Sequence, residues 1–481
     1  MRRQRQRARI GSPPRHRLPQ PREIRDIERI RNMLNSPRST IEMLTCSSAK
    51  GFMFEMTVDP GHSEFSNPGG ERITSFIVKL AVTSQQNDEE LDDYVPVNRG
   101  GTPVTKLTES AENYFQEAKI QQDVWITTVA GNRLPVSPPI VSFSLFDNEN
   151  GKNFLIFLNY KVKKPKSVHT VAYLRRVLQN PDYGIGMIIM SKVLHSDTFE
   201  SFLDLPRNGR NSFQGVPVTV DLVSDVYAKL VSKIVRFYIE VGVIHFDLHL
   251  KNALVYLNED SSLNVYVIDY GRASDIKDAT TNEYLGPAEK QPLYAKGKTL
   301  YTELLDLCLP GKRTTTPPTP QEKIKFISDV IDPLRKLEHA KSQELYGGET
   351  YQYGRYQFDW MEEITPMLRQ MLTRRTAHET REMFNGIAVM AFDNLCREIT
   401  VDIGRGADLS RATLQQSCVN FNNRTPSEFQ TPFLATWTEW ARSILPRLGR
   451  KLSSLVSRQG GKRRRTNVKR TRKLHKIKRI L

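Results

Sequence analysis

The stretch VIHFDLHLKNALVYLNEDSSLNVYVIDYGRAS sets four polar side chains among apolar residues. His245, Asp247 and Asn252 lie in the loop that leads into one apolar run, and Asp269 closes a second run, NVYVID. Two such runs around NEDSS predict a β-hairpin, which brings Asp247, Asn252 and Asp269 to one edge. Phosphoryl transfer needs such a group, because one carboxylate orients the attacking hydroxyl while an amide and a second carboxylate hold Mg²⁺ against the phosphates.

These residues form a recognisable pattern. HFDLHLKN followed by IDYG resembles HRDxxxxN and DFG, the catalytic loop and magnesium motif of the protein-kinase superfamily. The resemblance implies ATP and Mg²⁺ as cofactors, Asp247 as catalytic base, and Asn252 and Asp269 as metal ligands. It also implies a structural role for His245 and a flexible segment that starts at Gly271. As an alternative, an Asp-rich loop can cap a helix or form a turn between strands. His245 lies between apolar residues, which is typical of a histidine in the core.

A kinase-like site also needs a lysine on a strand and a glutamate on the following helix. Lys79 in SFIVKLAV resembles the lysine of the VAIK strand, and Glu117 in YFQEAKIQQ is the predicted partner. Both would bind the nucleotide. Glu109 and Glu112 belong to the same segment and are alternatives to Glu117, and an exposed lysine on an alternating strand is the alternative for Lys79.

Two further segments are expected to meet ATP. CSSAKGFM stands where kinases have a glycine-rich loop, and it keeps only Gly51 together with small residues such as Ser48. Small residues still let backbone N–H groups approach phosphate, although a plain hairpin turn explains the stretch as well. MIIMSKV resembles the strand before the hinge, so backbone groups of Ser191 to Val193 are expected to meet adenine.

The motif departs from protein kinases in ways that bear on the substrate. Phe246 replaces the Arg that receives an activation-loop phosphate, and His249 replaces the Lys that usually follows the base by two residues. HxDLHxxN is also typical of aminoglycoside- and choline-kinase-like enzymes, and GPAEK is only an echo of the APE motif. We expect a protein Ser/Thr kinase. The alternatives are a small-molecule phosphotransferase and a pseudokinase scaffold.

The combination of several features is similar to the divergent kinases of large nucleocytoplasmic DNA viruses. These features are SSAKGFMF, DLHLKN, IDYG, a helical C-terminal half and the basic tail. The similarity covers about residues 39–445, although its specific motifs support only the catalytic part.

The elements that must position these residues follow from hydrophobic periodicity. Short apolar runs before Phe199 predict strands, namely IEMLTCSS, GFMFEMTV, RITSFIVKLAV, NFLIFLNYKV and YGIGMIIMSKV. IRDIERIRNML and ESAENYFQEAKIQQDVW have helical spacing. Helical spacing dominates beyond Phe199, in a long helix that ends just before Gly242 and in EKIKFISDVIDPLRKL, DWMEEITPMLRQML and ETREMFNGIAVMAFDNLCREI.

These elements predict an α+β, bilobal protein-kinase-like fold. An antiparallel sheet forms the N-lobe, residues 39–195, with insertions, and a mainly helical C-lobe spans residues 196–446. Residues 1–38 form a basic, disordered arm and residues 447–481 a basic tail.

The net charge of +17 is concentrated in the two ends of the chain. Residues 447–481 hold 15 Lys and Arg and no acid, whereas residues 41–446 carry a net charge of −7. The charge therefore argues against a basic nucleic-acid-binding fold. The tail could recruit nucleic acid or an acidic partner, or simply be solvated. Neither a transmembrane segment nor a signal peptide is evident, so an intracellular protein (host cytoplasm, nucleus or virion if viral) that acts on protein substrates is expected.

The four cysteines, Cys46, Cys308, Cys396 and Cys418, are widely scattered. They form no CxxC pair and have no histidine at metal-ligand spacing, so neither a zinc site nor a disulfide framework is expected. The sequence predicts four reduced thiols.

Overall fold

The structure is a computed structural model of the 481-residue chain. It describes residues 22–45, 50–65, 72–84, 89–91, 94, 105–129, 135–206, 209–258, 261–277, 285–309, 316–346 and 377–403. All of them belong to one compact unit.

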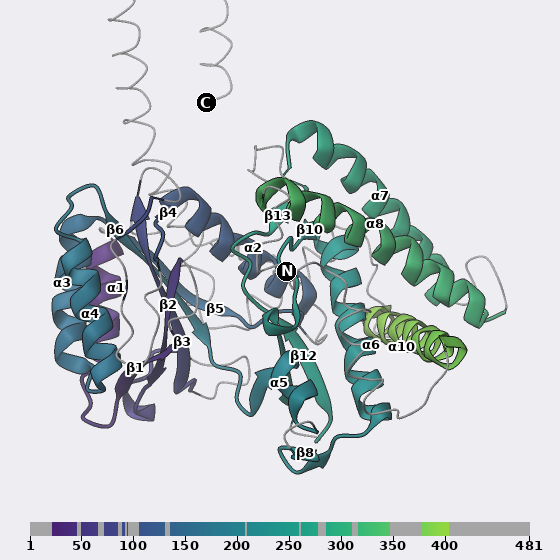
Figure 1. The fold of residues 1–481 in the computed structure, drawn as a ribbon, viewed down its shortest axis with the longest axis horizontal. Coiled ribbons are helices and arrows are strands. Elements are labelled where there is room, and N and C mark those ends of the chain that lie inside the picture. The colour runs from purple at the N-terminus through teal and green to yellow at the C-terminus, as the bar shows by residue number, and fades with distance from the viewer. Residues whose placement is uncertain are drawn as a thin grey trace, which may run out of the picture. The chain divides into compact units, whose positions relative to one another are not determined.

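The N-terminal half is built on a six-stranded sheet (Figure 1). Its main path runs β1 (Thr40–Thr45), β2 (Gly51–Thr57), β3 (Ser75–Ser84), β6 (Gly184–Ser191) and β5 (Ile140–Phe146), and every neighbouring pair is antiparallel. The short β4 (Glu109–Ser110) pairs with β3 in parallel. An antiparallel sheet in this half is what the strand-like runs predict, although β5 was not among them.

The two faces of the sheet pack against different helices. One face shares an apolar core with α1 (Arg22–Met33), α3 (Asn148–Lys161) and α4 (Pro165–Val177), which lie together beside the sheet in Figure 1. On β3 the side chains of Phe76, Val78, Leu80 and Val82 belong to this core. Because successive side chains of a strand point to opposite faces, Lys79 lies on the other face. That face meets α2 (Ala111–Val129), which contacts β3, β5 and β6.

The prediction that NFLIFLNYKV forms a strand is wrong, because this segment lies in helix α3 and the residue that follows it. The side chain of Asp147 accepts a hydrogen bond from the Asn150 backbone and caps the start of the helix. Phe154, Leu155 and Leu158 are buried, so one helical stripe packs on the sheet core. A short apolar run is compatible with a strand or a buried helix, and the upstream cap decides between them here.

The C-terminal half is mainly helical. Its long central helix α6 (Val220–Arg236) continues as a π-helical turn, η3 (Phe237–Val241), and ends at Gly242 with φ 76°. The predicted stop before Gly242 is confirmed, since glycine takes this left-handed conformation easily. The other described helices of this half are α5 (Phe199–Asp204), α7 (Pro287–Cys308), α8 (Pro320–Tyr346) and α10 (Ala377–Ile403), with the 3-10 turn η4 (Leu250–Asn252). The N-terminal half has a 3-10 turn of its own, η1 (Pro60–His62). The segment DWMEEITPMLRQML lies outside the described residues.

Small β elements sit against these helices. The predicted hairpin is present as β11 (Ala253–Leu257) and β12 (Leu263–Val267), which pair antiparallel, and β11 also pairs with β7 (Ser196–Thr198). Two further pairs are β10 (Val243–Ile244) with β13 (Ser274–Asp275), and β8 (Ser212–Phe213) with β9 (Val216–Pro217). The sheet-rich half followed by a helical half confirms the predicted α+β architecture and is consistent with a bilobal kinase-like fold.

The cysteine prediction is wrong for two residues. Cys308 at the end of α7 and Cys396 on α10 form a disulfide although 88 positions separate them. Packing of α10 on α7 brings them together, and sequence spacing does not show such a contact. Cys46 and Cys418 lie outside the described residues, and within the described ranges no group of three or more His, Cys, Asp or Glu residues could hold a metal by itself. None of the described helices is long and apolar enough to cross a membrane.

Candidate active site

A buried ion group joins three distant parts of the chain. The Lys79 ammonium lies 2.6 Å from Glu117 Oε1 on α2 and 3.3 Å from Asp269 Oδ1, just after β12. The side chains of Lys79 and Glu117 are 10% and 3% exposed. A buried lysine is costly unless it is paired, so these contacts fix strand β3, helix α2 and the end of the hairpin relative to one another.

The segment predicted as a helix holds three glutamates, and the geometry selects one. Glu112 is exposed in the first turn of α2, whereas Glu109 is buried in β4 and pairs with Lys50 at 3.8 Å. Only Glu117, among these three, forms an ion pair with Lys79 in the described structure. The backbone around this pair is also held, because the Tyr114 hydroxyl donates to Lys79 O at 2.9 Å.

The charges in this group reinforce one another. Burial alone would lower the pKa of the Lys79 ammonium, but Asp269 and Glu117 outweigh it and hold the pKa well above its ordinary range. Lys79 in turn lowers the pKa of Asp269, against the effect of burial. Burial raises the pKa of Glu117 to about 7, with Lys79 opposing that rise. At neutral pH the lysine is therefore a cation and Asp269 an anion.

The loop before β11 is tied to the end of β12 by backbone and side-chain bonds. Asn252 Nδ2 donates to Asp247 O at 2.8 Å, and Ile268 N donates to Asn252 O at 2.9 Å. His245 is fully buried, and its Nε2 lies 3.1 Å from Ile268 O while its Nδ1 accepts from Asp247 N at 3.3 Å. This pattern places the ring proton on Nε2. Burial lowers the pKa of His245, which favours the neutral, structural imidazole.

Asp247 lies beside a cation that sequence analysis did not single out. The Arg272 guanidinium is 3.6 Å from Asp247 Oδ1, and the Asp247 side chain is 24% exposed. Burial raises the pKa of Asp247, with Arg272 opposing the rise. A partly exposed carboxylate of this kind can orient or accept the proton of a hydroxyl group.

His249 stabilises the short turn that follows it. It precedes the short turn η4, and its Nδ1 accepts from Lys251 N at 3.2 Å. Burial lowers its pKa to about 4, so the ring is neutral at pH 7. His249 therefore does not supply the positive charge of the Lys that it replaces, and it helps to present Asn252 at the end of the turn.

A buried acid, Glu338, holds the backbone of the loop before β11. Phe246 has φ 57°, and its backbone N–H donates to Glu338 Oε1 on α8 at 3.4 Å. Sequence analysis missed Glu338, although it continues the buried stripe of Phe326, Val330 and Leu334 at intervals of four residues. A carboxylate on such a stripe signals a buried polar contact. Burial raises the pKa of Glu338 to about 8.

Of the remaining predicted nucleotide contacts, Gly51 and Ser191 lie on the sheet and Val193 follows it. Gly51 is the first residue of β2, opposite Ala81, and Ser48 lies outside the described residues. Ser191 ends β6, and its N–H donates to Pro139 O at 3.2 Å. Val193 O accepts from the Ser196 hydroxyl at 2.8 Å. Because the Ser191 N–H already donates to Pro139 O, an adenine ring at this segment would bind to other backbone atoms.

Asn252 and Asp269 have the donor chemistry that Mg²⁺ requires. The Asn252 amide nitrogen is used in the loop, which leaves its oxygen as the atom that can bind a cation. The Asp269 carboxylate is 46% exposed and ionised. Mg²⁺ commonly takes one or two carboxylates together with substrate phosphates, so these two residues fit a metal bound with a nucleotide.

Comparisons with known proteins found no matching family model and no matching curated protein. Among solved structures, the kinase domain of maize SIRK1 (sucrose-induced receptor kinase 1) bound to AMP-PNP is 13% identical, covers 76% of this chain and 95% of its own, and has a TM-score of 0.27. WaaP in complex with acyl carrier protein is 11% identical, covers 71% and 88%, and has a TM-score of 0.24. TM-scores this low support no conclusion about this chain.

Replacing Glu117 by Gln should weaken nucleotide binding, because Lys79 loses a buried, charged partner. We expect the dissociation constant of Mg-ATP, measured by calorimetry, to rise about tenfold. Glu112→Gln, an exposed change on the same helix, is the control and should leave it within about twofold. Equal affinities in the two variants would show that the Lys79–Glu117 pair does not serve nucleotide binding.

Glu338 should make stability depend on pH. Its pKa of about 8 exceeds the ordinary 4.5, so the folded protein holds a proton that the unfolded chain has lost between these values. Its contribution to stability therefore falls as the pH rises through this window, by up to about 1.4 kcal/mol per pH unit. Urea unfolding across the window should show a flatter dependence for Glu338→Gln than for Asp332→Asn, an exposed change on the same helix. Parallel curves for both variants would refute this assignment.

Proposed function

We propose that the chain transfers the γ-phosphate of ATP to a hydroxyl group, with Ser and Thr of proteins as the acceptors. The observation that carries the proposal is the Lys79 ammonium held between Glu117 and Asp269, at 2.6 and 3.3 Å. Positioning and charge stabilisation provide most of the catalysis in phosphoryl transfer. A fixed cation next to a partly exposed carboxylate suits both tasks.

Each residue has a role that its surroundings support. Lys79 would bind the phosphate oxygens and Glu117 would hold the lysine in place. Asn252 and Asp269 would hold Mg²⁺, which when bound with ATP neutralises negative charge on the phosphates. Asp247 would orient the acceptor hydroxyl and take its proton, since it is close to Asn252 through the loop hydrogen bond.

The end of the segment after Asp269 is held by an ion pair and a helix cap. This segment ends in GPAEK, which is only an echo of the APE motif of protein kinases and so weakens the case for a protein acceptor. Gly286 caps helix α7, and its N–H donates to Glu289 Oε2 at 3.0 Å. Glu289 also pairs with Lys341 of α8 at 3.5 Å, which fixes the end of the segment on the helical half.

A small-molecule phosphotransferase is the second candidate. His249 favours it, because the neutral ring stands where Ser/Thr kinases have a lysine and HxDLHxxN is typical of aminoglycoside- and choline-kinase-like enzymes.

We also propose a viral origin, an intracellular location, and recruitment of nucleic acid or acidic partners by the basic tail. Residues 447–481 lie outside the described residues.

The test uses the purified full chain with Mg²⁺, ATP labelled on the γ-phosphate, and separate mixtures of proteins and of hydroxyl-bearing metabolites. Asp247→Asn should lower the transfer rate about 10²- to 10⁴-fold while Mg-ATP still binds. Asp225→Asn, which removes a partly exposed acid paired with Lys229 on α6, is the control and should transfer at the wild-type rate.

Transfer to metabolites alone would select the second candidate. Equal transfer by wild type and Asp247→Asn would contradict the role of Asp247. Binding of Mg-ATP without any transfer would identify a nucleotide-binding scaffold.

A further inference from the structure

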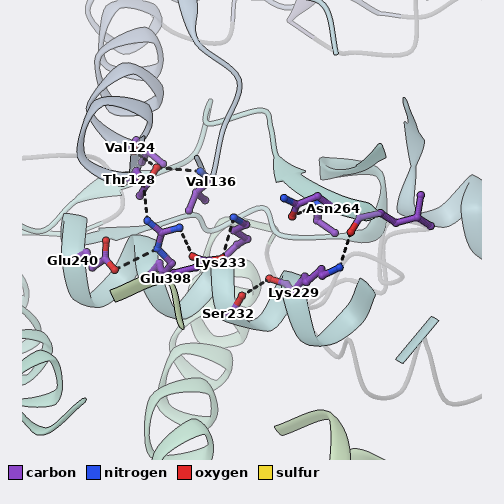
Figure 2. A network of polar contacts seen from close by, with 12 residues as sticks. Val124, Thr128, Val136, Lys229, Ser232, Lys233, Glu240, Asn264 and Glu398 are labelled. Carbon is purple, nitrogen blue, oxygen red and sulfur yellow. Dashed lines mark hydrogen bonds and ion pairs between the residues drawn. The ribbon is translucent and has the colours of Figure 1, made fainter. Parts of the chain in front are cut away.

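A buried cluster of charges lies at the other end of the helix that carries Glu117. Lys233 and Arg236 of α6, Glu240 of η3 and Glu398 of α10 form this network, which we call the Arg236 cluster. Figure 2 labels three of them, Lys233, Glu240 and Glu398. The side chains of Arg236 and Glu240 are fully buried, that of Lys233 is 1% exposed and that of Glu398 is 14% exposed. Two cations thus face two carboxylates away from water, so the removal of any one of the four leaves a buried charge uncompensated.

Each of the three guanidinium nitrogens of Arg236 contacts a different partner. Nε pairs with Glu240 Oε1 at 3.3 Å, and Nη1 pairs with Glu398 Oε2. Nη2 donates to Thr128 O at 2.8 Å. A guanidinium is planar and rigid, so the two carboxylates determine where its third nitrogen points.

Thr128 lies at the C-terminal end of α2, where carbonyl groups lack partners within the helix. A buried cation at this end also complements the helix dipole. The Thr128 hydroxyl donates to Val124 O at 2.7 Å and accepts from Val136 N at 3.0 Å, so the same turn is joined to the segment before β5. Arg236 therefore caps α2 and fixes its end on the helical half.

Glu398 has a special place in this cluster, because it contacts both cations. Its Oε1 lies 3.5 Å from Lys233 Nζ, while its other oxygen binds Arg236. Burial lowers the pKa of Lys233 to about 8, which shows how little the site tolerates an extra charge. Removing the Glu398 carboxylate would leave two buried cations with one buried anion fewer and would free Nη1 of Arg236 to move.

We propose that Glu398 of α10 is a positioning residue for the Lys79–Glu117 pair and acts through Arg236 and helix α2. Glu117 and Thr128 lie on one rigid helix, about 16 Å apart along its axis. A shift at the capped end is therefore transmitted to Glu117. The inference rests on the proposed function only in taking this pair as part of the nucleotide site. Helix α10, which lies far from the motifs in the sequence, thereby takes part in controlling that site.

The test is a double-mutant cycle of Glu398→Gln, Glu117→Gln and the combination. The first readout is the rate at which an amine-reactive acylating reagent modifies Lys79, normalised to the exposed Lys325 and measured well below the melting temperature. The second is the dissociation constant of Mg-ATP. Asp393→Asn, which removes an acid of α10 that pairs with Lys323 outside the cluster, is the control.

We expect Glu398→Gln to raise both the Lys79 acylation rate and the Mg-ATP dissociation constant about fivefold. In the Glu117→Gln background the Glu398 change should add no more than about twofold, because both act on the same pair. Asp393→Asn should change neither quantity by more than about twofold. Rescue by Glu398→Asp, even in part, would further support a role of the carboxylate. If Glu398→Gln does not fold, Arg236→Lys replaces it in the same cycle, because lysine keeps the positive charge but lacks the planar fork that joins Glu398, Glu240 and Thr128.

A merely structural role predicts a different result. Glu398→Gln would then lower the melting temperature but leave Lys79 acylation and Mg-ATP affinity of the folded protein unchanged, and this would overturn the proposal. Effects of Glu398→Gln and Glu117→Gln that simply multiply would also overturn it. Because acylation needs no nucleotide, a cycle that couples in acylation while wild type binds no Mg-ATP would support the coupling and refute the proposed function instead.

Discussion

The site depends on one physical constraint, the burial of the Lys79 ammonium. An ammonium out of water is tolerated only next to anions, and here Glu117 and Asp269 supply them from a helix and from the end of a hairpin. The sheet register, the position of α2 and the closure of the hairpin must therefore all be correct at once. The same group that makes the lysine stable also leaves Asp269 ionised and partly exposed, as its proposed role as a metal ligand requires.

Helix α2 is held by charge at two points, in its second turn and at its C-terminal end. Glu117 faces Lys79 on the sheet, and the last turn is capped by Arg236 from α6. Each contact is a buried ion or ion–dipole interaction, which loses much of its strength if the partner moves. A helix fixed in this way can relate the sheet to the helical half, and it gives α10 a route to the site through Glu398.

Apolar runs in the sequence allowed the local elements to be predicted, and the family resemblance added one long-range contact, the Lys79–Glu117 pair. A short apolar run identified β3 with Lys79 on it, and two apolar runs around NEDSS predicted the hairpin that carries Asn252 and Asp269 at its ends. Three contacts were missed: Arg236 with Glu398, the Cys308–Cys396 disulfide, and Glu338 with the Phe246 backbone. The first two join helices whose packing no local pattern encodes, whereas the buried stripe of α8 signals a polar contact at Glu338 but not its partner. The strand predicted at NFLIFLNYKV failed for the converse reason, since its periodicity alone does not separate a buried helix from a strand.

A crystal structure of the full chain with Mg²⁺ and a non-hydrolysable ATP analogue tests the central claim most directly. The account predicts a metal between the Asn252 amide oxygen and the Asp269 carboxylate. It also predicts the Lys79 ammonium about 2.7–3.2 Å from a phosphate oxygen, with Glu117 still bound to the lysine. An analogue bound elsewhere on the protein, or Lys79 and Asp269 in separate regions with no nucleotide between them, would contradict it.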